Sequence, residues 1–251
     1  MDLLIVSPTN MPAKIELLNS FLYNHPNLYA YYPMNGNSLD SKGNVNGSDT
    51  AMSYAYGANS FNQHAVFNGS TGRISLGTSK FDFLNFTISF CMVDKGTDSV
   101  RYLWARNPAA DQWANIFILM YGGLKVGGLG DPGAVETYAA VTNGAFYTFV
   151  FTTTATNNVD VYKNGVYLAG KTNGPAWNNN ITNETAIGRA GAYNAYYFDG
   201  KIDELSVFNI ALNPAQVKEL YNNGYKAEQY LKAQRRSRQL GLISNRYAGS
   251  F

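Results

Sequence analysis

Between about residues 29 and 208, short runs of β-branched and aromatic residues alternate with clusters of Gly, Asn, Asp and Ser. Such runs predict short strands, because branched and aromatic side chains suit a pleated surface and the clustered residues suit tight turns. The clearest runs are 65–67, 73–76, 86–90, 116–120, 147–151, 159–162 and 202–208. The pattern predicts an all-β fold.

The composition indicates one main domain with two extensions. Of the 251 residues, 45% are hydrophobic and 14% are charged, and 24 are glycines, which can supply the positive-φ positions of turns. All-β domains of this size commonly form one unit. We assign residues 1–28 to an N-terminal extension with a short helix, 29–225 to the β domain and 226–251 to a basic C-terminal tail.

Local motifs predict a hairpin and helices. Asn164-Gly165 suits a type I′ turn, since both residues tolerate positive φ. Asn213-Pro214 suits the cap and first position of a helix, and Gly224 suits its end. Residues 226–240 are rich in helix formers and predict a further helix.

The charge is distributed unevenly along the chain. Residues 226–251 carry six basic residues and one acidic residue, a net charge of +5, which leaves −3 for residues 1–225. Arg235, Arg236 and Arg238 are candidates for an electrostatic assembly contact, and the alternative is a solvated terminal helix. These three arginines have no aromatic residues interleaved among them and match no nucleic-acid-binding fold, so nucleic acid is not an expected partner.

The cysteine count, the apolar runs and the first residues exclude some common features of exported and membrane proteins. Cys91 is the only cysteine, which excludes an intrachain disulfide and favours a buried core position. No run approaches the roughly 20 apolar residues of a membrane-spanning helix. The first residues lack the pattern of a signal peptide. This start is compatible with cytosolic synthesis, export by another route or a removed leader.

Several motifs occur in order between about residues 29 and 221. They include YYPMNGNSLDSKGN at 31–44, AVFNG at 65–69, FTISFC at 86–91, VYKNG at 161–165, YFDGKIDEL at 197–205 and NIALNP at 209–214. Together they resemble the laminin-G-like jelly-roll family of the concanavalin-A-like superfamily, with Cys91 and Phe146 where that family often has Trp. The resemblance implies a jelly-roll sandwich of two antiparallel sheets, with residues 202–208 in a central strand.

The sequence lacks the patterns of common catalytic sites. Glucan hydrolases need two nearby carboxylates, and no Glu-x-Asp-x-x-Glu pattern occurs. Asp203 and Glu204 are adjacent, so on a regular strand they would point to opposite faces. His25 and His64 lie beside no nucleophile motif and suit structural positions. We therefore expect no enzymatic activity.

The resemblance also implies a structural Ca²⁺ ion, held by an aspartate and backbone carbonyls, the oxygen ligands that hard cations prefer. Matching the motifs residue by residue makes Asp40 and Asp203 the candidate ligands. The alternative is that Asp40 caps a turn and Asp203 accepts backbone N–H bonds.

Glycan binding needs an aromatic surface with a few orienting polar groups. Aromatic residues within polar loops supply the candidates, and the alternative is that each one closes an edge of the sandwich. The candidates are Trp113, Trp177, Asn178, Tyr193 and Tyr196, with Trp177 favoured by its run of asparagines.

These observations favour a non-catalytic structural and binding protein. The first hypothesis is a phage virion component, a capsid decoration or tail appendage, which attaches to assembly proteins through its termini. Virion proteins reach the outside by lysis, which would explain a laminin-G-like domain without a signal peptide. The second hypothesis is a secreted or cell-surface glycan-binding module, and the third is a divergent glycoside hydrolase or lyase. A homo-oligomer is compatible with each.

Overall fold

The computed structural model describes most of the β domain and the helix that follows it. The described residues are 24–56, 63–78, 80–96, 99–106, 116–128, 136–139, 141–154, 158–171, 184–190 and 195–226. The helix predicted within residues 1–28 and all but the first residue of the one predicted at 226–240 lie outside these ranges. None of the described helices is long and apolar enough to cross a membrane.

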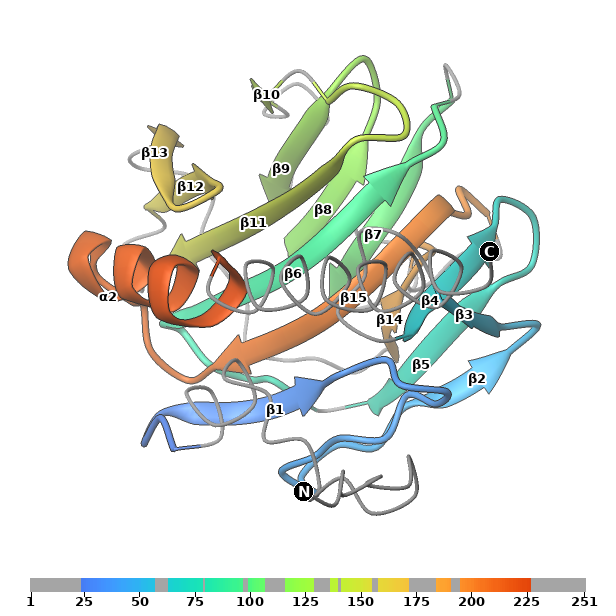
Figure 1. The fold of residues 1–251 in the computed structure, drawn as a ribbon, viewed down its shortest axis with the longest axis horizontal. Helices are drawn as coiled ribbons and strands as arrows, with labels where there is room; N and C mark the ends of the chain where they lie inside the picture. Colours follow the sequence, from blue (N-terminus) through green and yellow to red (C-terminus); the bar gives the residue numbers. More distant parts are fainter. Residues whose placement is uncertain are drawn as a thin grey trace, which may run out of the picture.

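Two antiparallel sheets face each other (Figure 1), which confirms the predicted fold class. The first sheet contains β1 (Leu28–Tyr32), β3 (Ser53–Tyr56), β4 (Gln63–Asn68), β6 (Phe86–Asp94), β11 (Phe146–Thr153), β12 (Val159–Lys163), β13 (Val166–Lys171) and β15 (Asp199–Phe208). The second contains β2 (Ser48–Thr50), β5 (Arg73–Thr78), β7 (Arg101–Arg106), β8 (Ile116–Met120), β9 (Leu124–Gly128), β10 (Glu136–Ala139) and β14 (Glu184–Ile187).

The strand order places β15 at the centre of the first sheet. That order is β13-β12-β11-β6-β15-β4-β3, and β1 pairs with the second half of β15. The second sheet has the order β10-β9-β8-β7-β14-β5-β2. All the runs that the sequence predicts as strands lie in strands. Asn164 and Gly165 have φ values of 51° and 77°, which confirms the type I′ turn.

A bulge in β15 overturns the expectation that Asp203 and Glu204 point to opposite faces. The pairing with β6 shifts between Asp203 and Ser206, and Glu204 has a φ of 54°. An extra residue breaks the alternation of a strand. Both carboxylates therefore act on Tyr31 of β1: its hydroxyl donates to Glu204, and its pKa is raised by burial first and then by both charges.

The main hydrophobic core fills the space between the sheets. Phe90, Phe149 and Phe151 of the first sheet pack there with Trp104 and Ile118 of the second. The rings of Phe90 and Phe151 stack with their centres 5.7 Å apart. Alternate residues of each strand point into this closely packed core. The alternating apolar pattern of the sequence therefore marks the buried face of each strand.

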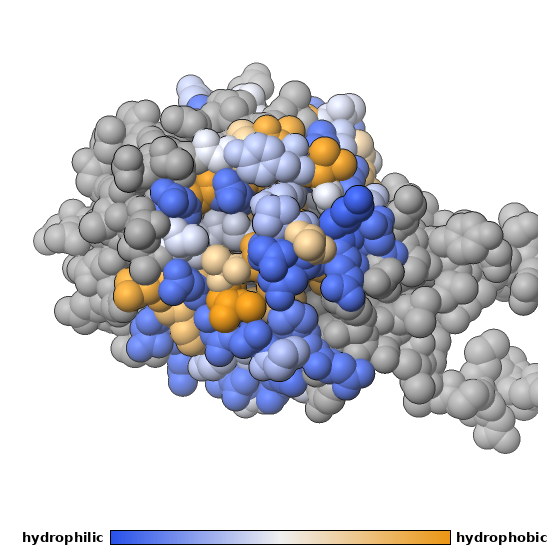
Figure 2. Space-filling model, turned by 90° about the vertical axis from the view of Figure 1, so that its left-hand side faces the viewer, coloured by the Kyte–Doolittle hydropathy of each residue, from blue (hydrophilic) through white to orange (hydrophobic). Residues whose placement is uncertain are grey.

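A second core lies on the outer face of the first sheet, beneath the helical segment of residues 214–226 (Figure 1). Cys91 belongs to it and is fully buried, as predicted. It packs with Val217 and Leu220 of the helical segment. On the side of the molecule that carries this helix, Figure 2 shows hydrophobic residues in separate spots among hydrophilic ones. The helix thus covers apolar surface of the sheet.

The helix α2 (Pro214–Glu219) begins at the predicted cap. The Asn213 side chain accepts the N–H of Gln216 at 3.0 Å, and the Gln216 side chain accepts the N–H of Asn213 at 2.9 Å. The segment continues as the π-helical η2 (Leu220–Lys226), so the predicted end at Gly224 is wrong. Burial of Tyr225 explains the extension, since its hydroxyl lies 2.8 Å from the hydroxyl of Ser89 on β6.

His64 makes the stability of the folded state depend on pH. It is buried in β4, and burial, reinforced by the charge of Lys201, lowers its pKa from 6.5 to about 4. Because the unfolded chain takes up a proton near pH 6.5 and the folded chain does not, protonation favours unfolding. We expect stability to be full above pH 6.5 and to fall by about 3 kcal/mol as the pH decreases towards 4.

Urea denaturation at a series of pH values measures this loss. His64→Asn should reduce the dependence in the upper part of the range, where carboxylates do not yet titrate, and His25, whose pKa burial also lowers, accounts for what remains. An equally steep loss in the variant would show that another group is responsible.

Candidate functional site

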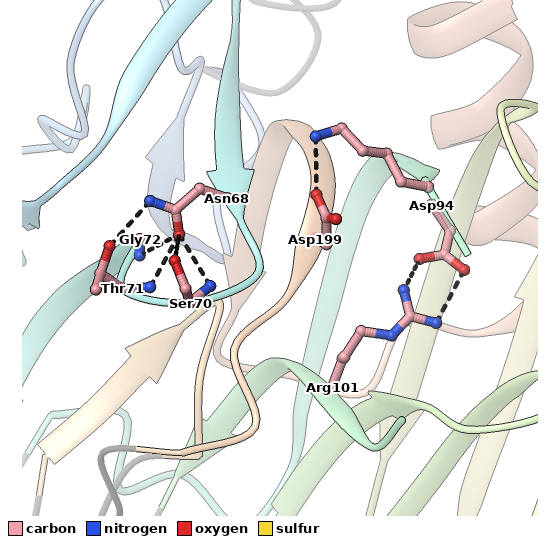
Figure 3. Close-up of polar contacts among 8 residues, drawn as sticks. Asn68, Ser70, Thr71, Gly72, Asp94, Arg101 and Asp199 are labelled. Carbon is pink, nitrogen blue, oxygen red and sulfur yellow. Dashed lines mark hydrogen bonds and ion pairs between the residues drawn. The ribbon is translucent and has the colours of Figure 1, made fainter. Parts of the chain in front are cut away.

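At one end of the sandwich, strand ends from both sheets gather polar side chains (Figure 3). β4 ends at Asn68 and β6 at Asp94, while β7 begins at Arg101 and β15 at Asp199. Antiparallel neighbours bring these ends together although they are far apart in the sequence. We call the exposed and half-exposed residues at this end the rim: Asn68, Lys95, Tyr196 and Asp199.

Asn68 holds its own loop in shape (Figure 3). Its Oδ1 accepts the backbone N–H groups of residues 70–72 at 2.9 to 3.0 Å. Gly69 has a φ of 73°, and a Cβ atom there would lie 3.0 Å from the Cβ of Asp199. The loop therefore packs directly against the start of β15.

Two ion pairs of different exposure lie next to each other at this end (Figure 3). Arg101 donates both Nη groups to the carboxylate of Asp94, and the two side chains are only 5% and 3% exposed. Lys95 Nζ lies 2.8 Å from Asp199 Oδ1, with side chains 51% and 24% exposed. Because Asp94 belongs to the first sheet and Arg101 to the second, the buried pair ties the sheets together beneath the rim.

Tyr196 supplies an aromatic surface at the rim. Its side chain is 48% exposed, and its backbone has the left-handed φ of 59°. Its carbonyl accepts the N–H of Tyr102 at 2.9 Å, and the two rings lie 5.9 Å apart. Tyr102 is itself buried against Phe117. The exposed ring of Tyr196 therefore contacts the ring of Tyr102, which is held in place by burial.

The rim can bind a hydroxyl-rich ligand. An aromatic ring offers a face against which a sugar ring can stack, and amide, ammonium and carboxylate groups can bond its hydroxyls. Lys95 and Asp199 neutralise each other, and so do Asp94 and Arg101 beneath them. The site thus combines one apolar surface with several polar groups and little net charge.

Of the predicted glycan-binding residues, Tyr196 is the one that the structure describes: it lies three residues before Asp199, and its ring contacts that of Tyr102. The other candidates, Trp113, Trp177, Asn178 and Tyr193, lie outside the described residues. The predicted assembly-contact residues Arg235, Arg236 and Arg238 lie outside them as well. Predictions about these residues stay predictions.

Asp40 occupies a loop after β1. Its Oδ1 accepts the N–H groups of Tyr31 and Lys42 at 2.8 and 2.9 Å, and its Oδ2 accepts those of Asn44 and Val45 at 2.8 and 3.0 Å. These donors surround the carboxylate, which favours the turn-capping alternative over a calcium ligand.

Asp203, the second candidate ligand, is 2% exposed in β15. Among the described residues, no group of three or more His, Cys, Asp or Glu side chains is placed to hold a metal ion. Calcium binding stays a prediction from the family resemblance.

Sequence reasoning did not single out Asn68, Lys95 or Asp199 as binding residues. Asn68 and Asp199 each precede a glycine within a family motif, and that is the signal that could have found them. Lys95 carries no local signal, because only the pairing of β6 with β15 brings it to Asp199.

The two antiparallel sheets define a lectin/glucanase-like β-sandwich. The family described as the concanavalin A-like lectin/glucanases superfamily, of laminin G type, matches residues 68–218. This chain belongs to that family.

Solved structures show the same fold. Domain 4 of AbnA, a GH43 extracellular arabinanase from Geobacillus stearothermophilus in complex with arabinotriose, is 25% identical with a TM-score of 0.65, covering 77% of this chain and 98% of that one. The Trypanosoma rangeli sialidase in complex with the inhibitor DANA is 13% identical with a TM-score of 0.61, covering 77% of this chain and 32% of that one.

The receptor-binding domain of botulinum neurotoxin type G is 14% identical with a TM-score of 0.57, covering 78% of this chain and 51% of that one. This chain thus spans about half of the neurotoxin domain and about a third of the sialidase. No curated protein matches the sequence.

Proposed function

We propose that this chain is a non-catalytic carbohydrate-binding β-sandwich that holds a neutral glycan at the rim. The observation that carries the proposal is Tyr196, an exposed aromatic residue in a left-handed backbone conformation. Such a conformation is unfavourable for a residue with a side chain and is concentrated at ligand-binding positions. Contact with Tyr102 keeps the ring in place before a ligand arrives, which lowers the entropy cost of binding.

The charges of the rim favour a neutral ligand over an acidic one. Lys95 is the basic residue of the rim, and its ammonium lies 2.8 Å from the carboxylate of Asp199. An acidic sugar would compete with this carboxylate for Lys95, whereas a hydroxyl group can bond either partner without separating them. The arabinotriose bound to the similar arabinanase domain is a neutral oligosaccharide, which supports this ligand class.

The positions of the carboxylates support a binding role without hydrolysis. Glycoside hydrolysis needs two carboxylates that flank the sugar bond in a site the substrate can enter. Asp203 and Glu204 share one face of the first sheet, but they are 2% and 0% exposed beneath Tyr225. Asp94 is 2% exposed and engaged by Arg101. A polysaccharide therefore cannot reach the carboxylates of Asp94, Asp203 and Glu204.

The test is binding of neutral oligosaccharides, with arabinotriose as the first probe, measured by isothermal titration calorimetry. Tyr196→Ala should weaken binding by about thirtyfold, since truncating an aromatic anchor costs about 2 kcal/mol. Recovery of the oligosaccharide uncleaved after long incubation is the expected result for a non-catalytic protein.

The matched control is Tyr56→Ala. Tyr56 is 80% exposed on β3, where it pairs with Gln63 at the start of β4, the end of that strand opposite the rim. This variant should bind like the wild type. Equal binding by Tyr196→Ala would remove the rim as the site, and failure of the wild type to bind any neutral oligosaccharide in a panel would remove the proposed function.

The virion hypothesis stays a prediction. It depends on attachment through the termini, and the basic tail beyond residue 226 lies outside the described residues. A glycan-binding head is compatible with display on a virion and equally with secretion, so the binding experiment applies to both.

A further inference from the structure

Four polar side chains are buried between the sheets, at the end opposite the rim. Trp104 and Arg106 belong to the second half of β7, Thr185 to the start of β14 and Thr153 to the end of β11. Each of the four is at most 1% exposed. We call them the inner donor cluster.

Strand pairing brings the members of this cluster close to one another. Arg106 is the cross-strand partner of Thr185, which puts their Cβ atoms about 5 Å apart on one face of the second sheet. Trp104 contributes to the core between the sheets, on that same face. In the first sheet Phe86 pairs with Thr153, and the guanidinium carbon of Arg106 lies 5.4 Å from the centre of the Phe86 ring.

The donors of the cluster exceed the acceptors that the described chain supplies. Nη1 of Arg106 donates to the carbonyl of Phe81. Within the described ranges, Nε and Nη2 of Arg106 and Nε1 of Trp104 meet no hydrogen-bond partner. The same holds, over those ranges, for the hydroxyl groups of Thr153 and Thr185.

Such an arrangement is unfavourable as it stands. Buried polar groups in proteins are almost always paired, because a lost hydrogen bond to water is otherwise not replaced. Burial lowers the pKa of Arg106 to about 10, and the charge of the exposed Asp82 acts in the opposite direction, so the guanidinium still carries a charge at neutral pH. Guanidinium and indole groups only donate hydrogen bonds. The cluster therefore calls for an acceptor with negative charge.

We infer that the inner donor cluster binds a halide-sized inorganic anion, enclosed between the two sheets. Such an anion can accept hydrogen bonds from the Nε and Nη2 groups of Arg106 and from its cross-strand neighbour Thr185, and its charge neutralises the guanidinium. Water fits less well, because it brings no charge and its own hydrogens need acceptors. The burial of all four side chains excludes the acidic group of a larger ligand. This inference is independent of glycan binding at the rim.

The first experiment compares thermal unfolding in sodium chloride and in sodium gluconate at equal ionic strength. An anion that binds only the folded state stabilises it by mass action, so the melting temperature should rise with the logarithm of the chloride concentration. Identical melting in the two salts at every concentration would overturn the inference.

Variants assign the effect to the cluster. Arg106→Met keeps the volume of the side chain but removes the charge, and it should melt alike in both salts. Lys125→Met removes one cation from a half-buried position on β9 and should keep the difference seen in the wild type. Loss of the difference in Lys125→Met, or its persistence in Arg106→Met, would contradict the assignment.

A milder variant covers the case in which Arg106→Met does not fold. Thr185→Val keeps the shape and the charge of the cluster but removes one donor, and it should weaken the apparent chloride affinity about tenfold. Crystals grown in sodium bromide provide the direct check. An anomalous peak beside Arg106 is expected, and a map with peaks only at the surface would refute the inference.

Discussion

Replacing Asp94 with asparagine is expected to destabilise the protein by about 3 to 5 kcal/mol, because it removes the carboxylate that bonds both Nη groups of the buried Arg101. The two side chains are 3% and 5% exposed, so water cannot take over the lost interaction. The free energy of unfolding from urea denaturation measures the effect. The loss should be larger than that of any exposed ion pair in this chain, since the pair joins one sheet to the other.

The neighbouring pair provides the matched control. Lys95 and Asp199 are 51% and 24% exposed, and Lys95→Met should cost less than about 1 kcal/mol. The double variant Asp94→Leu/Arg101→Met should recover most of the stability, because apolar side chains of similar volume avoid the desolvation of two charges. A double variant as unstable as Asp94→Asn would show that the pair contributes more than its own neutralisation.

Gly188→Ala is expected to destabilise the protein by about 3 kcal/mol, the combined cost of a left-handed backbone and of overpacking. Gly188 has a φ of 85°, and a Cβ atom there would lie 2.2 Å from Cε1 of Phe67. The Phe67 ring is fully buried and packs edge-on against Phe198, with the ring centres 5.8 Å apart, so it has little room to move. Differential scanning calorimetry or urea denaturation measures the loss.

Gly77→Ala separates the two contributions. Gly77 has a similar φ of 78°, but a Cβ atom there would meet nothing within 4 Å. This variant should lose only the backbone contribution, about 1 kcal/mol. Phe67→Leu should restore part of the stability of Gly188→Ala, since contacting residues are coupled. Equal losses in the two glycine variants would mean that contact with Phe67 has no energetic consequence.

The sequence was sufficient to single out Tyr196, but not the strand β7 beside it. Tyr196 stood out as an aromatic residue in a polar loop, and the structure shows it to be exposed, while its role in binding stays a prediction. β7 was not predicted, because arginines at both of its ends hide the strand pattern. Both are buried: Arg101 against the carboxylate of Asp94, and Arg106 against the carbonyl of Phe81.

The sequence by itself determined the features that a few neighbouring residues encode. The Asn164-Gly165 turn and the Asn213 cap depend on backbone preferences within one or two turns of chain, and the all-β class depends on an alternation repeated along each strand. Only the tertiary structure decided which distant residues meet. Strand register places Lys95 beside Asp199 and Arg106 beside Thr185, and one extra residue in β15 turns Asp203 and Glu204 to the same face. Register depends on packing summed over both sheets, which no short stretch of sequence contains.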